Sequence, residues 1–298
     1  MVRFAIAGIQ MQVSAFEENI SQMGRYLSHV RQRFPWVNMV VFSELAALGP
    51  SPLKAEPMPG EAESRLCEMA GSHGLWLVPG SLFELRDGQI FNMSPVIDPA
   101  GNVIARFRKL FPFRPYEQGV AAGSEFVVFD VPGAGRIGIS ICYDMWFPET
   151  TRTLAAMGAE VILHPTMTDT IDRDVELAIA RASAATNQVY FFDINGVGQG
   201  GVGRSIVVDP SGYVLHEASA GAAEIIPIEI DFGKVRRERE LGLRGLGQPL
   251  KSFRDRGVEF PVYQRGTGAD AYLHSLGPLR KPGEPERAEP GLAGPGGD

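Results

Sequence analysis

The stretch that most constrains the fold is residues 137–149, where an apolar run ends in a single cysteine and a helix start follows at once. Isoleucine at every second position is typical of a buried strand. Proline and glutamate within 147–151 are typical of a first helical turn. Cys142 is therefore predicted at a strand end beside backbone N–H groups, which can lower a thiol pKa and hold an oxyanion. The simpler alternative is a small apolar core residue, the commoner fate of a free cysteine.

Buried strands and amphipathic helices alternate along most of the chain. Apolar runs predict strands at 4–9, 38–42, 75–80, 91–97, 103–107, 126–130, 137–142, 161–164, 189–194, 204–208, 213–216 and 224–230. Spacing and charge patterns predict helices at 15–33, 61–72, 149–157, 172–187 and 233–244. A capping box of Ser14 and Glu17 is expected to open the first helix. This alternation indicates a layered α/β architecture, whose strand ends commonly hold functional sites.

Composition narrows the classes of function. The chain has 298 residues, is 44% hydrophobic and 21% charged, and carries a formal net charge of -7. An acidic balance argues against a nucleic-acid or anionic-membrane surface as the main partner. No apolar run is long enough to span a bilayer, and the N-terminus enters a strand directly, so no signal peptide is expected. Two cysteines in a chain of this length suggest a reducing compartment, so we expect a cytoplasmic protein.

Neither a metal nor another cofactor is expected. The five histidines are scattered without metal-ligand spacing. Residues 196–201 match the dinucleotide pattern GxGxxG by letter and follow a strand. The next segment reads as a strand and a turn, whereas a pyrophosphate site requires the N-terminus of a helix. The glycines are therefore interpreted as a tight loop.

The domain organisation is predicted from composition. Residues 1–265 are expected to form one domain, with a C-terminal arm from about residue 233. Residues 266–298 are expected to be mostly disordered, because proline, glycine, glutamate, arginine and alanine dominate this end.

Reactive side chains follow three of the predicted strands. Glu44, Lys109 and Cys142 each lie where an apolar run ends, and Glu117 lies on a loop rich in proline, glycine and charge. For each charged residue the simpler reading is a solvated loop side chain. A carboxylate at the end of a buried strand can instead be a general base. Only a fold can bring together groups so distant in sequence.

The ordered blocks around these residues resemble the nitrilase superfamily of carbon–nitrogen hydrolases. The blocks with the reactive residues are 42–44, 107–110 and 141–144 with 147–149. Supporting matches lie at 181–182, 187–190, 203–205 and 209–212. A cysteine motif alone would be weak, whereas glutamate, lysine and cysteine blocks in the family's order are highly specific.

One loop is similar to the aliphatic amidase and formamidase branch of that superfamily. Lys109 opens a Lys-x-x-Pro segment, and residues 115–119 resemble the branch's Pro-x-Glu-Gly motif. The match implies that Glu117 is the family's second glutamate, which would position the substrate nitrogen or Lys109, or assist proton transfer. Leu45 and Gln118 depart from the branch pattern and would border the substrate pocket.

The resemblance implies a four-layer α-β-β-α sandwich that forms a homodimer or a higher homo-oligomer. The helices at 149–157 and 172–187 are the candidates for the contact between copies.

The resemblance also implies a thiol hydrolase that cleaves a small amide through a thioester on Cys142. Glu44 would be the general base, and Lys109 with the backbone N–H of Tyr143 would hold the oxyanion. A nearby lysine should favour the thiolate. Candidate pocket residues are Tyr116, Trp146 and Met167, for each of which ordinary packing is the alternative.

Other readings of the same residues stay open. The triad would equally serve an N-carbamoyl amine or amino acid, or a nitrile, although the amidase-like loop argues against a nitrile. A non-catalytic interaction protein on this scaffold is a further alternative, which the intact set of reactive residues disfavours. A redox-sensing thiol would lack a resolving cysteine in view.

Overall fold

The computed structural model describes residues 3–264, 266, 268 and 270–283. The described chain forms two compact units. The first holds residues 3–112 and 119–257, and the second holds residues 113–118 and 258–283.

The first sheet is built around β1 (Phe4–Gln10), which is buried along its whole length. It pairs in parallel with β3 (Met39–Phe42) and antiparallel with β16 (Glu224–Ile230). The sheet also contains β4 (Trp76–Val78), β5 (Leu82–Arg86), β6 (Gln89–Ile97), β7 (Val103–Arg108) and β8 (Val120–Ala121). Strands β6 and β7 form an antiparallel pair.

The second sheet places the strand that leads to Cys142 in its interior. The strand order is β15 (Val214–Glu217), β14 (Ile206–Val208), β12 (Tyr190–Asn195), β11 (Val161–Thr166), β10 (Gly135–Ile139) and β9 (Val127–Val131). The pairs β10–β11 and β11–β12 are parallel, so the C-terminal ends of these three strands lie at one edge. A separate short pair joins β2 (Gln12–Val13) to β13 (Val197–Gly198).

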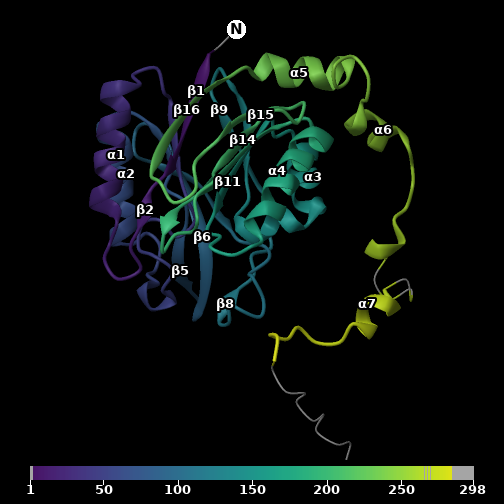
Figure 1. The fold of residues 1–298 in the computed structure, drawn as a ribbon, viewed down its shortest axis with the longest axis horizontal. Coiled ribbons are helices and arrows are strands. Elements are labelled where there is room, and N and C mark those ends of the chain that lie inside the picture. The colour runs from purple at the N-terminus through teal and green to yellow at the C-terminus, as the bar shows by residue number, and fades with distance from the viewer. Residues whose placement is uncertain (1–2, 265, 267, 269, 284–298) are drawn as a thin grey trace, which may run out of the picture. The chain divides into compact units, whose positions relative to one another are not determined.

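Alternating side chains divide the apolar residues of the first unit into layers. Ile6 and Val41 of the first sheet share a buried cluster with Ile139, Leu163 and Phe192 of the second, so the main core lies between the sheets. Helices α1 (Ile20–Arg33) and α2 (Glu61–His73) cover the outer face of the first sheet. Helices α3 (Pro148–Ala156) and α4 (Arg173–Asn187) cover the second (Figure 1). The predicted four-layer α-β-β-α arrangement is thereby confirmed.

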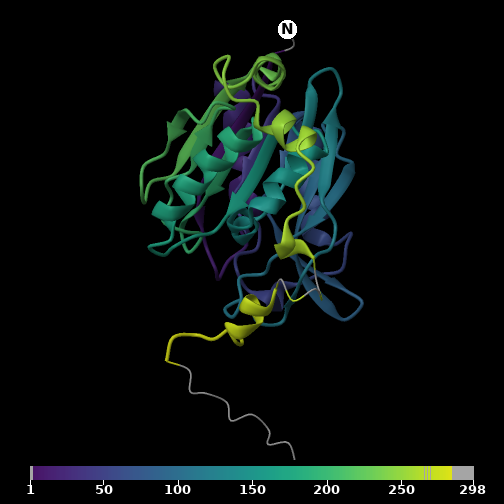
Figure 2. The same cartoon turned by 90° about the vertical axis from the view of Figure 1, so that its right-hand side faces the viewer.

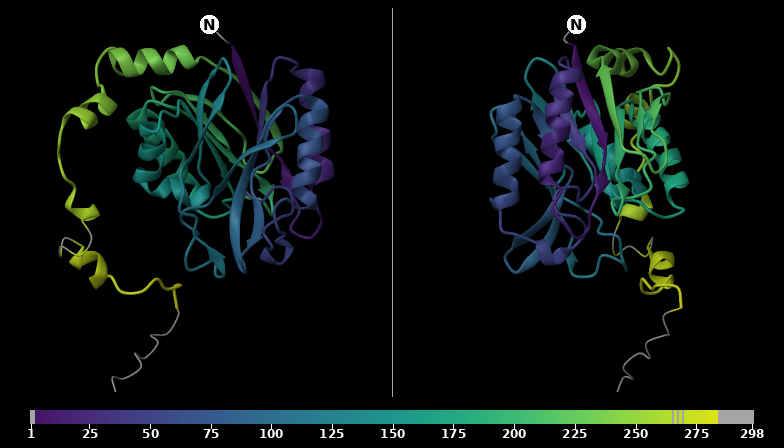
Figure 3. Two further views of the ribbon diagram at one scale, coloured as in Figure 1. Left: turned by 180° about the vertical axis from the view of Figure 1, so that it is seen from behind. Right: turned by 60° about the vertical axis from the view of Figure 1, so that its left-hand side comes forward.

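The same layers are visible from other directions. Helices α3 and α4 lie in front of the second sheet in Figure 2. The left view of Figure 3 shows α1 and α2 on the opposite side of the first unit from α3 and α4. The remaining helices are α5 (Phe232–Leu241), α6 (Pro249–Asp255) and α7 (Ala271–Ser275), with short 3-10 helices η1 (Pro52–Lys54), η2 (Cys142–Trp146) and η3 (Pro261–Tyr263).

Several boundaries differ from the prediction, and two of them are informative. Helix α1 begins at Ile20, because the Ser14 hydroxyl accepts the N–H groups of Phe16 and Glu17 in a local turn instead of capping a helix. Strand β10 ends at Ile139, so Cys142 opens the 3-10 helix η2 and is not itself in the strand. The α-helix start after it lies at Pro148, as predicted.

Other elements had no clear periodic signal. Strand β5 was not predicted, because the charged residues Glu84 and Arg86 interrupt its apolar run. Helix α6 and η3 lie within the 245–264 stretch, where scattered apolar residues gave no period. Of the tail predicted as disordered at 266–298, residues 284–298 lie outside the described residues, and the described part contains α7.

Candidate active site

Glu44 and Lys109 meet in the interior of the first unit. Glu44 lies two residues beyond β3, and Lys109 follows β7 directly. Lys109 Nζ lies 2.9 Å from Glu44 Oε1, and each residue is only 1% exposed. Removing two charges from water is costly, so a buried pair is poor evidence of a stabilising role. Its burial at converging strand ends fits a chemical role better.

A third residue fixes the Glu44 carboxylate. Asn92 on β6 donates from Nδ2 to the same oxygen, Oε1, at 2.7 Å. The backbone completes the arrangement, because Glu44 N donates to Thr166 O at 3.2 Å and Lys109 N donates to Asn92 O at 2.8 Å. The sequence prediction missed Asn92, although a fully buried amide within an apolar strand is a signal that could have found it.

The Cys142 turn has an unusual backbone and its own carboxylate clamp. Cys142 has φ 47°, a left-handed conformation that costs a non-glycine residue about 1–3 kcal/mol and is concentrated at functional sites. Asp144 accepts the N–H of Ile141 at 2.9 Å and the N–H of Phe111 at 2.8 Å. The Asp144 side chain therefore ties the cysteine turn to the segment that follows Lys109. Burial raises the Asp144 pKa to about 7, against the effect of these two hydrogen bonds and of Lys109.

The resting thiol of Cys142 is protonated near neutral pH. Part of the residue is accessible to solvent, yet the surrounding protein is dense enough for desolvation to raise the thiol pKa well above its ordinary value. Glu44 raises the pKa further, and Lys109 with the Thr166 side chain lowers it. The expected effect of lysine is present, but the prediction of a thiol with a lowered pKa is wrong, because desolvation outweighs it. A nucleophile of this kind needs a base.

A neutral histidine lies behind the cysteine turn. His164 on β11 is fully buried, and its Nδ1 lies 2.7 Å from the hydroxyl of Ser140. Burial lowers the His164 pKa to about 3, and Arg173 and Lys109 act in the same direction. His164 is therefore uncharged at neutral pH and belongs to the structural support of the site.

The predicted pocket and oxyanion residues lie in two different units. In the first unit, the Tyr143 ring packs edge-on against Phe147 at 5.3 Å, and Trp146 is 6.1 Å from Tyr143. Met167 packs on a small apolar cluster that contains Leu45. The roles of these residues remain predictions.

Tyr116 and Glu117 belong to the second unit. The Glu117 carboxylate accepts the N–H of Phe113 at 2.5 Å, and the Tyr116 ring stacks on Phe113 at 4.9 Å. The structure therefore gives Glu117 a local role in its own loop. Its predicted place as a second glutamate at the active site remains a prediction.

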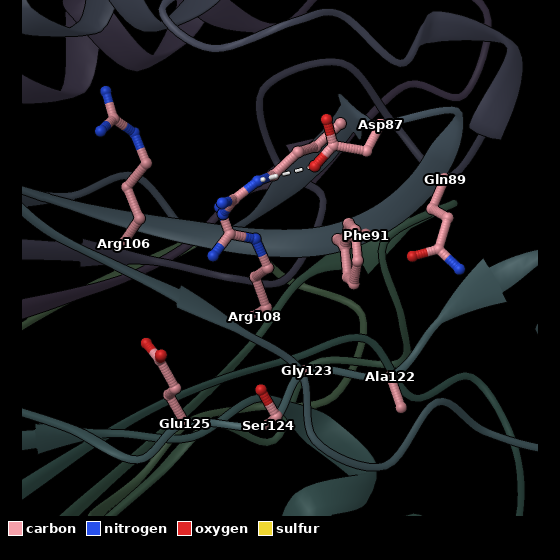
Figure 4. Close-up of a pocket in the computed structure, with 10 residues that line it drawn as sticks. Asp87, Gln89, Phe91, Arg106, Arg108, Ala122, Gly123, Ser124 and Glu125 are labelled. Atoms are coloured by element: carbon pink, nitrogen blue, oxygen red, sulfur yellow. Dashed lines mark ion pairs between the residues drawn. The ribbon is translucent and has the colours of Figure 1, made fainter.

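A separate pocket of about 410 Å³ lies beside β7 (Figure 4). Arg106 and Arg108 line it, whereas Lys109, the next residue in sequence, faces Glu44. Arg106 holds Glu63 at 2.7 Å and Arg108 holds Glu84 at 2.6 Å. Carboxylates therefore engage both of these guanidinium groups, and the third arginine of the pocket, Arg86, lies exposed with its Nε 3.5 Å from Asp87 Oδ2.

The described part of the chain contains neither a metal-binding cluster nor a membrane-spanning helix. No cluster of three or more histidine, cysteine, aspartate or glutamate side chains in this part of the chain could hold a metal ion. Among the same residues, no helix combines the length and apolar character that crossing a membrane requires.

Comparison with known proteins identifies the family. The family model described as carbon-nitrogen hydrolase matches residues 3–240. The chain belongs to the carbon–nitrogen hydrolase family. The match covers β1 through α5, and therefore contains Glu44, Lys109 and Cys142.

Curated relatives and solved structures agree with this assignment. The chain is 29% identical to the human omega-amidase NIT2 over 261 residues, covering 80% of this chain and 93% of that protein. It is 32% identical to a nitrilase of Pyrococcus abyssi over 213 residues, covering 67% and 74%. The structure of Saccharomyces cerevisiae Nit3, a member of branch 10 of the nitrilase superfamily, matches with a TM-score of 0.73 at 26% identity, covering 80% and 93%. The chain is a carbon–nitrogen hydrolase of the nitrilase superfamily.

Proposed function

We propose that this enzyme hydrolyses the C–N bond of a small linear amide through a thioester on Cys142. The observation that carries the proposal is the buried pair of Glu44 and Lys109, 2.9 Å apart, whose charges both act on the Cys142 thiol. A base, a cation and a protonated thiol in one water-poor site match the requirements of acyl transfer.

In the first half-reaction, Cys142 Sγ adds to the amide carbonyl carbon while Glu44 takes the thiol proton. Lys109 Nζ and the Tyr143 backbone N–H hold the oxyanion of the tetrahedral intermediate. The C–N bond then breaks as Glu44 returns the proton to the leaving nitrogen, which departs as ammonia or an amine. The acyl group remains on sulfur as a thioester.

The second half-reaction regenerates the thiol. Glu44 takes a proton from water, and the resulting hydroxide adds to the thioester carbon. The C–S bond breaks, the carboxylic acid leaves, and Cys142 is protonated again. Glu117 is proposed to assist by positioning the substrate nitrogen or Lys109, and Tyr116, Trp146 and Met167 to border the substrate.

The curated relatives include both substrate classes, because human NIT2 is an omega-amidase and the Pyrococcus abyssi relative is a nitrilase. The omega-amidase match covers more of this chain, 80% against 67%, and supports an amide. Met167 packs on the apolar cluster that contains Leu45, the residue directly after Glu44. Apolar side chains at this position would suit an uncharged substrate.

We further propose a cytoplasmic homodimer or higher homo-oligomer in which α3 and α4 meet their counterparts. Exposed apolar side chains on and beside these helices support this contact, namely Met157 directly after α3, Ile171 shortly before α4 and Val175 on α4. Sedimentation of the purified protein tests the assembly, and a monomer would contradict it. Cell fractionation tests the location.

Incubation with short amides, carbamoyl compounds and nitriles, scored by ammonia release, tests the activity. We expect amides to be cleaved and Cys142→Ala to abolish turnover while the protein still folds. Mass spectrometry should place a trapped acyl adduct on Cys142, and Cys67→Ala is the matched control that keeps activity. Persistent ammonia release by Cys142→Ala would contradict the mechanism, and release of CO2 from carbamoyl compounds alone would reassign the substrate.

A further inference from the structure

Three ionisable side chains form a buried cluster next to the proposed site. Arg173, the first residue of α4, is 2% exposed, Glu176 is 3% exposed and Asp193 on β12 is 0% exposed. Arg173 Nη1 lies 3.0 Å from Glu176 Oε2 and 2.8 Å from Asp193 Oδ2. Burying three such groups is expensive, and replacing such clusters by apolar residues is often neutral or stabilising. The cost of burying this cluster therefore indicates a role other than stability.

The cluster holds the segment that follows β11. Thr168 Oγ1 donates to Glu176 Oε1 at 3.0 Å, and the Thr168 backbone is fixed by Asn195 through two hydrogen bonds of 3.0 Å. Two residues earlier, Thr166 O accepts the N–H of Glu44. Residues 166–168 are thus anchored to Glu44 at one end and to Glu176 at the other.

Arg173 fixes the orientation of Glu176. Its Nη1 holds one carboxylate oxygen, while its Nη2 donates to Arg204 O at 2.8 Å. The other oxygen of Glu176 is then directed at Thr168. Removing the guanidinium would leave Glu176 as a buried carboxylate without its cation, and would release the anchor of residues 166–168.

One charge of the cluster affects the pKa of the Cys142 thiol. The charged groups that act on the Cys142 thiol are Glu44, Lys109 and Glu176, and Glu176 raises its pKa. Arg173 in turn acts on His164, which lies on β11 two residues before Thr166. Because Arg173 Nη1 lies 3.0 Å from Glu176 Oε2, the guanidinium is placed to offset the effect of that carboxylate on the thiol.

We propose that Arg173 is a positioning residue of the amide-hydrolysis site, which offsets the negative charge of Glu176 and thereby lets a thiolate form at Cys142 during attack. The inference rests on the proposed function for its catalytic meaning. Its effect on the thiol is measurable without any substrate.

The test is the rate at which iodoacetamide alkylates Cys142, measured from pH 6 to pH 10 in a Cys67→Ser background. Only the thiolate reacts, so the profile reports its formation. We expect Arg173→Met to move the profile to higher pH by about one unit, which is about tenfold slower alkylation at a fixed pH on the rising limb. Arg173→Met/Glu176→Gln removes both charges and should restore the parent profile, and Arg173→Lys should keep most of it.

Glu176→Gln alone keeps the proposal testable if Arg173→Met does not fold. It removes the opposing charge, so alkylation should shift to lower pH. Arg239→Met is the matched control, because Arg239 is a partly buried arginine that donates to the backbone carbonyls of Gln188 and Ala159. Its profile should equal the parent's.

Two results would overturn the proposal: an unchanged profile in folded Glu176→Gln or Arg173→Met, or a double variant as slow as Arg173→Met. Amide turnover of the parent separates this proposal from the proposed function. If no amide is cleaved but the alkylation profiles shift as expected, the amide assignment fails while the effect of Arg173 on the thiol stands.

Discussion

Asn92→Leu tests whether Glu44 is a base whose ionised form is favoured by a buried donor. The change removes the 2.7 Å hydrogen bond from Asn92 Nδ2 to Glu44 Oε1 and keeps a side chain of similar size. Asn92 Oδ1 has no partner among the described residues, so its loss leaves no further group unsatisfied. A hydrogen bond to a charged group contributes about 1.5–3 kcal/mol. At about 1.36 kcal/mol per pH unit, the acid limb of kcat/KM should move about 1–2 units higher.

The assay is ammonia release from a short amide, with kcat/KM followed from pH 5 to pH 9. The matched control is Asn187→Leu, since Asn187 is also buried and donates to a carbonyl, Ser183 O, at 2.9 Å on α4. That variant should lose stability without moving the acid limb. An acid limb in Asn92→Leu that coincides with the parent's, in a protein that folds, would refute the reasoning about Glu44.

Two further changes address the remaining groups. Glu117→Gln should lower kcat by about 10²-fold while the fold is kept, because glutamine can still accept the N–H of Phe113. The control is Glu125→Gln, at an exposed glutamate that lines the pocket beside β7, and it should leave kcat unchanged. Equal rates in both variants would remove Glu117 from the mechanism. His164→Asn tests whether the lowered pKa of His164 makes the stability of the fold depend on pH. The pKa of about 3 in the folded protein lies below the ordinary 6.5, so the contribution of His164 to stability is present above pH 6.5 and is lost as pH falls toward 3. Between pH 6.5 and pH 4 the wild type should therefore lose about 3 kcal/mol more unfolding free energy than His164→Asn in urea titrations, and parallel curves would contradict this.

The layered fold could be predicted because its strands are apolar throughout and its helices are amphipathic. The run at 4–9 is β1 nearly residue for residue, and the helix predicted at 172–187 is α4. The start of α1 could not be placed, because Ser14 satisfies local N–H groups either in a turn or in a helix cap, and sequence does not separate the two. Strand β5 is stabilised by pairing with β6, and its own sequence, with Glu84 and Arg86 among its five residues, does not predict that tertiary contact.

The site, like the fold, contains residues that the sequence predicts and residues that it does not. Glu44, Lys109 and Cys142 stand at the ends of apolar runs, where reactive types are conspicuous, and the structure brings Glu44 and Lys109 into contact. Asn92 is marked in the sequence only as an amide within an apolar strand, and its partner Glu44 lies on a distant segment. Arg173 acts through contacts that link distant segments, so its residue type alone gives no signal. The thiol pKa also escaped prediction, since it depends on how much water surrounds Cys142, which spacing does not report.

Charge compensation explains how one interior region accommodates so many ionisable groups. Glu44 is balanced by Lys109, and Glu176 is balanced by Arg173. Burial raises the pKa of Asp193 to about 7, so near neutral pH this second carboxylate can hold a proton and leave the Arg173 cluster close to neutral. The Cys142 thiol then rests uncharged among ion pairs whose charges balance. Proton transfer from sulfur to Glu44 neutralises the partner of Lys109 at the moment the thiolate forms, so the lysine charge becomes available to the sulfur and then to the oxyanion.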